Sequence, residues 1–103
     1  MFRKRRFADL IARQLALFER DHADVIAEAQ ARLDAYNSAD REEAEELYGD
    51  YVDAVETGTE ILADMRWEYI RTLDDDAAEE YEVEFNRAVM KRLPAFGLEI
   101  DDR

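Results

Sequence analysis

The sequence contains no cysteine, one proline, three glycines and one histidine in 103 residues. Without cysteine, disulfides, thiol nucleophiles and thiolate-ligated zinc or iron–sulfur sites are excluded. One histidine also excludes a multi-histidine metal site within a single chain. So few turn-forming residues argue against a multi-turn β fold and against an α/β fold with many loops.

Long apolar runs are lacking as well. The basic start at residues 1–6 resembles that of a signal peptide, but Asp9, Arg13 and Gln14 interrupt the apolar segment that would have to follow. No stretch of about 18 apolar residues is available to span a membrane. We therefore expect a soluble cytoplasmic protein. The 12 arginines against 2 lysines, with 16 alanines, indicate a bacterial genome rich in G and C.

What the sequence does contain is charge and a normal hydrophobic content. Hydrophobic types make up 48% of the residues and charged types 40%, with 27 acidic against 14 basic residues and a net charge of −13. The hydrophobic content is sufficient for a folded domain, and the length is sufficient for one domain. We expect a single helical domain over residues 1–103, with a basic arm at 1–6 and a C-terminal tail at 95–103.

Apolar residues recur at intervals of three or four, which is typical of one face of a helix. This spacing predicts a first helix over residues 6–36. The members of its apolar stripe are Ile11, Leu15, Phe18, His22, Val25, Ala29, Leu33 and Tyr36.

A second helix is predicted over residues 41–73. Asp40 is placed to cap it, and Glu43 completes the pattern of a capping box. Gly49 and Gly58 lie inside this helix, where each costs about 1 kcal/mol relative to alanine. We expect these glycines to mark a kink or a close contact between helices.

A third helix is predicted over residues 76–93. Aspartates at 74–76 place negative charge at its start, and basic residues in its last turns are favourable at a helix end. Pro94 is expected to end it. The tail that follows is predicted to dock as an extended strip through Phe96, Leu98 and Ile100.

The predicted fold is therefore all-α. The first two helices, each roughly 45–50 Å long, form an antiparallel hairpin, and Tyr36, Tyr48 and Tyr51 are expected to cluster near its turn. The third helix covers only half of that length. We expect homodimerisation to complete a bundle, with Trp67, which lies off the main apolar stripe, as an interaction residue.

Charge is distributed unevenly along the chain. Residues 21–103 carry 25 acidic and 8 basic residues, which indicates either a solvated charged face or an acidic surface that docks a protein partner with a basic surface or mimics nucleic acid. That acidity argues against nucleic-acid binding by the domain as a whole. The basic arm contains Arg3, Lys4, Arg5 and Arg6. It is either solvated, paired with the acidic end of the third helix, or in contact with anionic membrane or nucleic acid.

The one histidine lies three residues after a glutamate, in the order Glu19-Arg-Asp-His22. This Glu-x-x-His spacing places an oxygen and a nitrogen ligand on one helix face, as in carboxylate-bridged di-iron bundles. Across the predicted hairpin, Glu56 and Glu60 lie level with His22. The arrangement resembles the half-ferritins that build a di-iron site at a dimer interface, which implies iron or another divalent metal. The alternative is a partly buried core histidine bonded to a carboxylate or a carbonyl.

Together these features favour a non-catalytic helical interaction or assembly module with an acidic surface, homodimeric, and with no catalytic residues predicted. The alternative is a small ferritin-like metal protein that uses Glu19, His22, Glu56 and Glu60 across a dimer. A third hypothesis is a peripheral adaptor that contacts anionic membrane or nucleic acid through residues 3–6.

Overall fold

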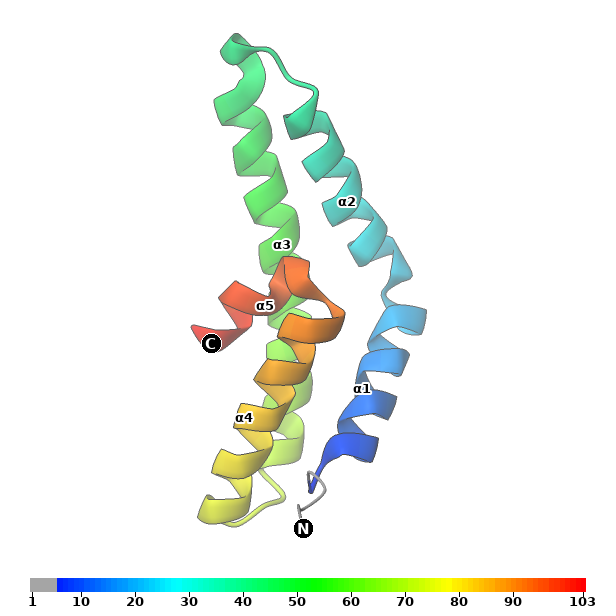
Figure 1. Cartoon of the computed structure of the whole chain (residues 1–103), viewed down its shortest axis with the longest axis vertical. Helices are drawn as coiled ribbons and strands as arrows, with labels where there is room; N and C mark the ends of the chain where they lie inside the picture. Colours follow the sequence, from blue (N-terminus) through cyan, green and yellow to red (C-terminus); the bar gives the residue numbers. More distant parts are fainter. Residues whose placement is uncertain (1–5) are drawn as a thin grey trace.

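The computed structural model describes residues 6–103, and this part of the chain is helical with no β-strand. The all-α prediction is thus confirmed (Figure 1). The five helices are α1 (Ala8–Asp21), α2 (Ala23–Asn37), α3 (Arg41–Ile70), α4 (Asp75–Arg92) and α5 (Pro94–Asp101). None of them is long and apolar enough to cross a membrane.

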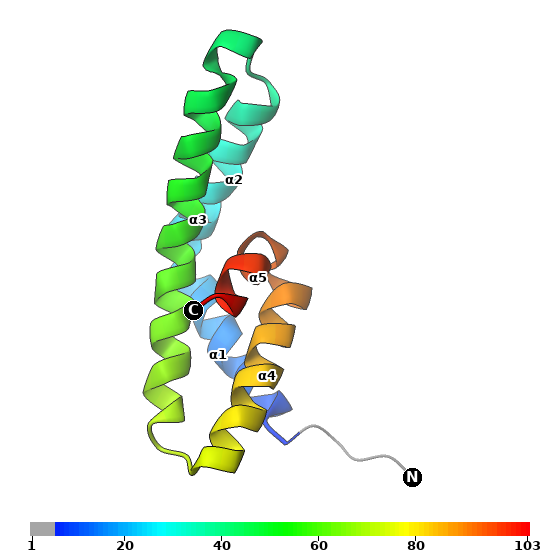
Figure 2. The ribbon, with the colours of Figure 1, turned by 90° about the vertical axis from the view of Figure 1, so that its left-hand side faces the viewer.

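The molecule is elongated, with extents of 53 × 26 × 25 Å. The longest helix, α3, forms its axis: α2 packs along one half of α3, while α1 and α4 lie beside the other half (Figure 1). The short α5 crosses near the middle and packs on both α3 and α4. Figure 2 shows the tip of the α2–α3 hairpin standing clear of α4 and α5.

The prediction of one continuous helix over residues 6–36 is wrong at one point, because the helix is interrupted at His22. The backbone of His22 leaves helical geometry with φ −125° and ψ 35°. Its N–H still donates to the carbonyl of Phe18 at 2.8 Å, and its own carbonyl accepts from Val25 at 3.0 Å, so α2 restarts at once. The bend allows α1 to pack against α4 while α2 packs against α3.

The second predicted helix is confirmed as α3, which runs without interruption through both glycines and ends at Ile70, three residues early. The side chain of Asp40 accepts a hydrogen bond from the N–H of Glu43 at 3.2 Å, as its capping role requires. Gly58 is the site of a close helix contact. A Cβ there would lie 2.4 Å from the Phe96 ring, whereas nothing lies within 4 Å of one at Gly49.

The third predicted helix is confirmed as α4, and Asp74 caps it by accepting from the N–H of Ala77 at 2.9 Å. The extended tail is a wrong prediction, because Pro94 ends α4 and is also the first residue of α5. Proline is well suited to a first helical position, where its missing N–H has no partner to lose. With α5 helical, Phe96 and Ile100 fall on one side and are buried.

The hydrophobic core lies where α1, α3, α4 and α5 meet. Its fully buried large side chains include Phe18, Leu62, Tyr81, Phe85 and Phe96. The hairpin tip instead carries the predicted tyrosine cluster. The ring centroids of Tyr36 and Tyr48 are 5.2 Å apart, and those of Tyr48 and Tyr51 are 6.2 Å apart.

Candidate functional site

A buried arginine occupies the junction of α3, α4 and α5. The side chain of Arg66 is 0% exposed. Its Nη1 donates to the Oδ1 of Asn86 at 2.6 Å and to the carbonyl oxygen of Ile100 at 3.1 Å, which ties α3 to both other helices. Within residues 6–103 its Nε and Nη2 have no hydrogen-bond partner. Arg66 therefore holds a positive charge in the interior with two of its three guanidinium nitrogens unsatisfied.

The electrostatic surroundings of Arg66 partly offset this burial. Burial lowers the pKa of Arg66, while the negative charges of Glu82, Tyr81 when ionised, and Asp101 act in the opposite direction. Neither carboxylate forms an ion pair with Arg66 in the described part of the chain. Because an arginine side chain stays protonated in proteins, the group remains a cation.

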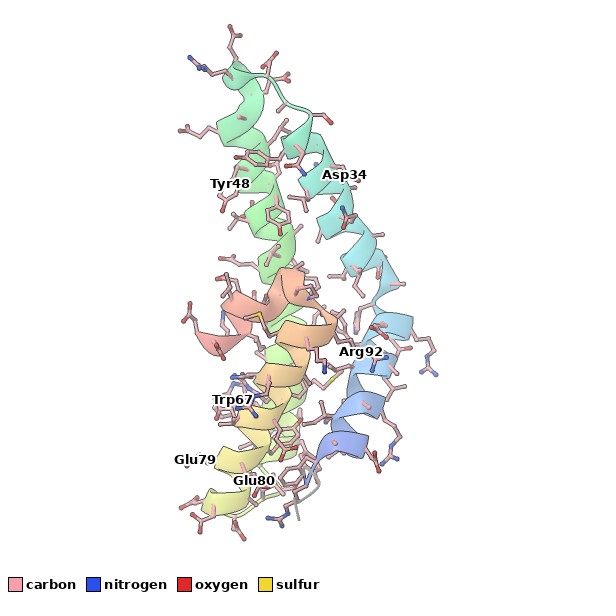
Figure 3. The ribbon with its side chains drawn as sticks, in the orientation of Figure 1. Asp34, Tyr48, Trp67, Glu79, Glu80 and Arg92 are labelled. Atoms are coloured by element: carbon pink, nitrogen blue, oxygen red, sulfur yellow. The ribbon has the colours of Figure 1, made fainter. Side chains whose placement is uncertain are left out.

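Trp67 lies over this charge. The Arg66 Cζ atom is 5.1 Å from the indole ring, a distance at which a cation is attracted to the ring face. The indole is nevertheless 43% exposed. Trp67, labelled in Figure 3, directly follows Arg66, whose guanidinium reaches Asn86 of α4. It thus covers a buried cation on one side and faces solvent on the other.

Three further large apolar side chains are exposed on the neighbouring helices: Val83 and Met90 on α4, and Leu98 on α5, which is 76% exposed. Val83, Asn86, Arg87, Met90 and Asp101 line a shallow hollow of about 310 Å³. Met90 packs on Gly97, the residue before Leu98. We call Trp67, Val83, Met90 and Leu98 the Trp67 face. Exposed apolar surface gathered in this way is typical of an interaction site.

The predicted metal ligands do not come together within one chain. Both carboxylate oxygens of Glu19 bind Arg92, at 3.0 and 2.8 Å. His22 is half-buried at the α1–α2 junction, with its ring 5.5 Å from that of Phe18, and Glu56 and Glu60 are exposed on α3. Residues 6–103 contain no group of three carboxylate or imidazole side chains able to hold a metal ion. The site across a dimer stays a prediction.

Of the basic arm, Arg3, Lys4 and Arg5 lie outside the described residues. Arg6 lies near the acidic start of α4, where its Nη1 is 3.7 Å from Glu80. The sequence predicted this pairing as one option for the arm. Both side chains are about half exposed or more, at 60% and 47%, so the pair contributes little to stability.

Sequence reasoning missed Arg66 because the stripe of the second helix was traced through apolar residue types alone. Its position held the signal: Arg66 lies four residues after Leu62 and four before Ile70, in the middle of the buried stripe. A charged residue at such a position predicts a buried polar contact. Asn86 carried no comparable signal.

No protein-family model, curated protein or solved structure matches this chain. The assignment of function therefore rests on the surface and interior chemistry of the chain itself.

Proposed function

We propose that the protein is a non-catalytic helical interaction module that forms a homodimer through the Trp67 face. The observation that supports this proposal is the exposed Trp67 ring over the buried Arg66 cation. Tryptophan, arginine and methionine are enriched at the centres of protein interfaces, and tryptophan and arginine supply a large share of binding energy there. Met90 and Val83 line the hollow around Asn86, the residue to which Arg66 donates a hydrogen bond.

Charge also favours this face over the rest of the surface. With a net charge of −13, two copies repel each other wherever acidic surfaces meet. The hollow on the Trp67 face carries one cation and one anion, Arg87 and Asp101, and neither has an ion pair within residues 6–103. In a two-fold dimer each subunit presents the same patch, so Arg87 of one copy would face Asp101 of the other.

The test is the subunit number of variants that place a charge on this face. Leu98→Glu and Val83→Glu alter exposed side chains and leave the core intact. Each should raise the dimer dissociation constant about tenfold or more in sedimentation velocity. Leu17→Glu is the matched control, because Leu17 is 44% exposed on α1, outside the Trp67 face. A wild-type monomer at micromolar concentration, or a dimer insensitive to both variants, would contradict the proposal.

Native mass spectrometry of the same samples tests the metal alternative. A dimer that carries whole-number metal mass, and loses it in His22→Ala, would favour the ferritin-like hypothesis over the interaction module. Metal-free wild-type dimer after metal-supplemented expression would remove that hypothesis.

The remaining acidic surface is suited to a basic protein partner, which would bind less tightly as salt is added.

A further inference from the structure

We propose that the groove between α1 and α4 binds a medium-chain fatty carboxylate, with its alkyl chain on the groove floor and its carboxylate at the cationic rim. The groove lies outside the Trp67 face and shares only Arg87 with the hollow on that face, so the test of its charged rim uses Lys91, which lies outside that hollow.

The floor of the groove is apolar because of small residues on both helices. Ala8 and Ala12 on α1 and Ala88 on α4 leave a hollow of about 270 Å³. Beneath it lie Ile11 and Leu15, which are 2% and 1% exposed. Both α1 and α4 start at the same end of the molecule (Figure 1). The lining of the hollow runs from Ala8 to Leu15 on α1 and from Glu84 to Arg92 on α4. The result is a channel with an apolar floor that is open to solvent.

The rim of the channel is positively charged. Arg87 and Lys91 are exposed at its edge, and neither forms an ion pair within residues 6–103. Arg92 is held in place by Glu19 and donates to the carbonyl of Ala12 at 3.3 Å. Cations in the last turns of a helix compensate its dipole. That accounts for their sign but leaves the apolar hollow beside them unexplained.

The opposite end of the groove carries Glu84, the one acidic residue that the described part of the chain contributes to the lining. Glu84 accepts a hydrogen bond from the N–H of Phe7 at 3.2 Å, next to the start of α1. The groove thus has a cationic end near Lys91 and an anionic end near Glu84. A ligand with one negative head would be oriented along the groove by these charges.

Size and lining select the ligand class. Ligand pockets for drug-sized molecules run to about 300–1,000 Å³, so a hollow of about 270 Å³ suits a small ligand. Among residues 6–103, the lining offers no aromatic ring, hydroxyl or amide side chain with which to recognise a base or a sugar. From Ala8 to Leu15 the floor extends roughly 10 Å along α1, a length suited to a medium alkyl chain.

The experiment is titration of the ¹⁵N- and methyl-labelled protein with decanoate, below the concentration at which decanoate aggregates. We expect saturable binding of a single equivalent, with shifts concentrated at Ile11, Ala12, Leu15 and Ala88. Decanol, which has the same chain and no charge, should bind about tenfold more weakly.

Variants separate the head from the chain. Lys91→Glu should raise the dissociation constant for decanoate about tenfold, whereas Arg13→Glu, with the same charge change on an exposed α1 position outside the groove, should leave it nearly unchanged. Ala12→Leu fills the hollow from an exposed position, keeps every charge and should abolish binding. Leu98→Glu should bind as wild type does, which keeps this test independent of the dimer.

Three results would overturn the inference. Equal affinity for decanoate and decanol would show that the rim recognises no anion. Binding of many equivalents that survives Ala12→Leu would show adsorption elsewhere. Shifts at the groove that depend on protein concentration, without a response to decanoate, would assign the groove to contact with a second copy of the chain.

Discussion

Arg66 carries a positive charge into the interior at the point where three helices meet. Transfer of such an ion out of water costs several kcal/mol, which good hydrogen bonds and nearby opposite charges offset only in part. Here one nitrogen of the guanidinium makes both bonds, to Asn86 and to Ile100. The contact with Asn86 is therefore the most consequential side-chain hydrogen bond of the junction.

Asn86→Ala should lower the free energy of unfolding by about 1–3 kcal/mol, because it removes an acceptor from a buried cation. The same change in an Arg66→Met background should cost about 1 kcal/mol less, since no cation is then left unsatisfied. Urea denaturation followed by circular dichroism measures all four proteins of this cycle. Equal costs in the two backgrounds would show that the bond contributes nothing.

Tyr81 is the second residue whose burial has a measurable effect. Its side chain is 0% exposed, and its hydroxyl donates to the Oε1 of Gln14 at 2.8 Å. Burial raises the pKa of Tyr81 to about 12. In the unfolded chain the pKa of a tyrosine is about 10.

Above about pH 10 the unfolded chain therefore loses this proton while the folded chain keeps it. Stability from Tyr81 should be complete below about pH 10 and fall as the pH rises toward 12, by up to about 2 kcal/mol. Urea unfolding at a series of alkaline pH values measures the loss. Tyr81→Phe should lose less stability across the same window, and an equal loss would place the cause elsewhere.

Among the elements, α3 contains glycine at two positions where the same substitution has opposite effects. Gly58 leaves room for the Phe96 ring, and through it for α5, whereas a Cβ at Gly49 would have no neighbouring atom within 4 Å. A methyl group at 58 must displace a buried ring in a close-packed core. A methyl group at 49 enters solvent.

Gly49→Ala should stabilise the protein by about 0.5–1 kcal/mol, because alanine has the higher helix propensity. Gly58→Ala gains the same propensity but should be net destabilising by about 1–2 kcal/mol, because overpacking outweighs it. Thermal or urea unfolding of the two variants provides the comparison. Stabilisation by both would mean that α5 moves aside without cost.

The helices themselves were largely predictable from the sequence. Capping aspartates at 40 and 74 and the three-to-four spacing of apolar residues are local signals, and local hydrogen bonds satisfy them. The break at His22 has no such signal, since neither glycine nor proline is near it. It depends on α1 and α2 packing against different helices. Likewise, α5 is short, and its helical form depends on docking Phe96 beside Gly58.

The candidate surface was less predictable than the fold. Trp67 was predicted to be an interaction residue because it departs from the apolar stripe, and this departure can be seen from the sequence alone. The pairing of Arg66 with Asn86 joins residues twenty positions apart on two helices, and no periodicity specifies such a contact. The groove between α1 and α4 depends on the relative position of helices separated by most of the chain.

For the whole molecule, net charge is the dominant long-range term. The ion pairs of the described residues join side chains that are all more than a third exposed, so each contributes little. Repulsion among the 27 acidic residues is not offset by 14 basic ones. Folding brings these charges together and strengthens their repulsion.

Added salt should therefore raise the melting temperature. Going from about 10 mM to about 150 mM salt shortens the Debye length from about 30 to about 8 Å. Each kcal/mol of repulsion screened should raise the melting temperature by about 4–8 °C in a domain of this size. Calorimetry at one fixed protein concentration measures the effect. A fall with salt would show that the ion pairs outweigh the repulsion.

The tip of the α2–α3 hairpin extends beyond α4 and α5, and no side chain between residues 30 and 54 is fully buried. Cooperativity in unfolding comes from shared burial, so this segment is coupled only weakly to the rest. Its amide hydrogens should exchange through local opening, at a free-energy cost well below that of global unfolding. Tyr36, Tyr48 and Tyr51 then report on that opening. A melting curve that is followed through tyrosine absorbance or fluorescence therefore combines the local opening of the hairpin tip with global unfolding in one signal.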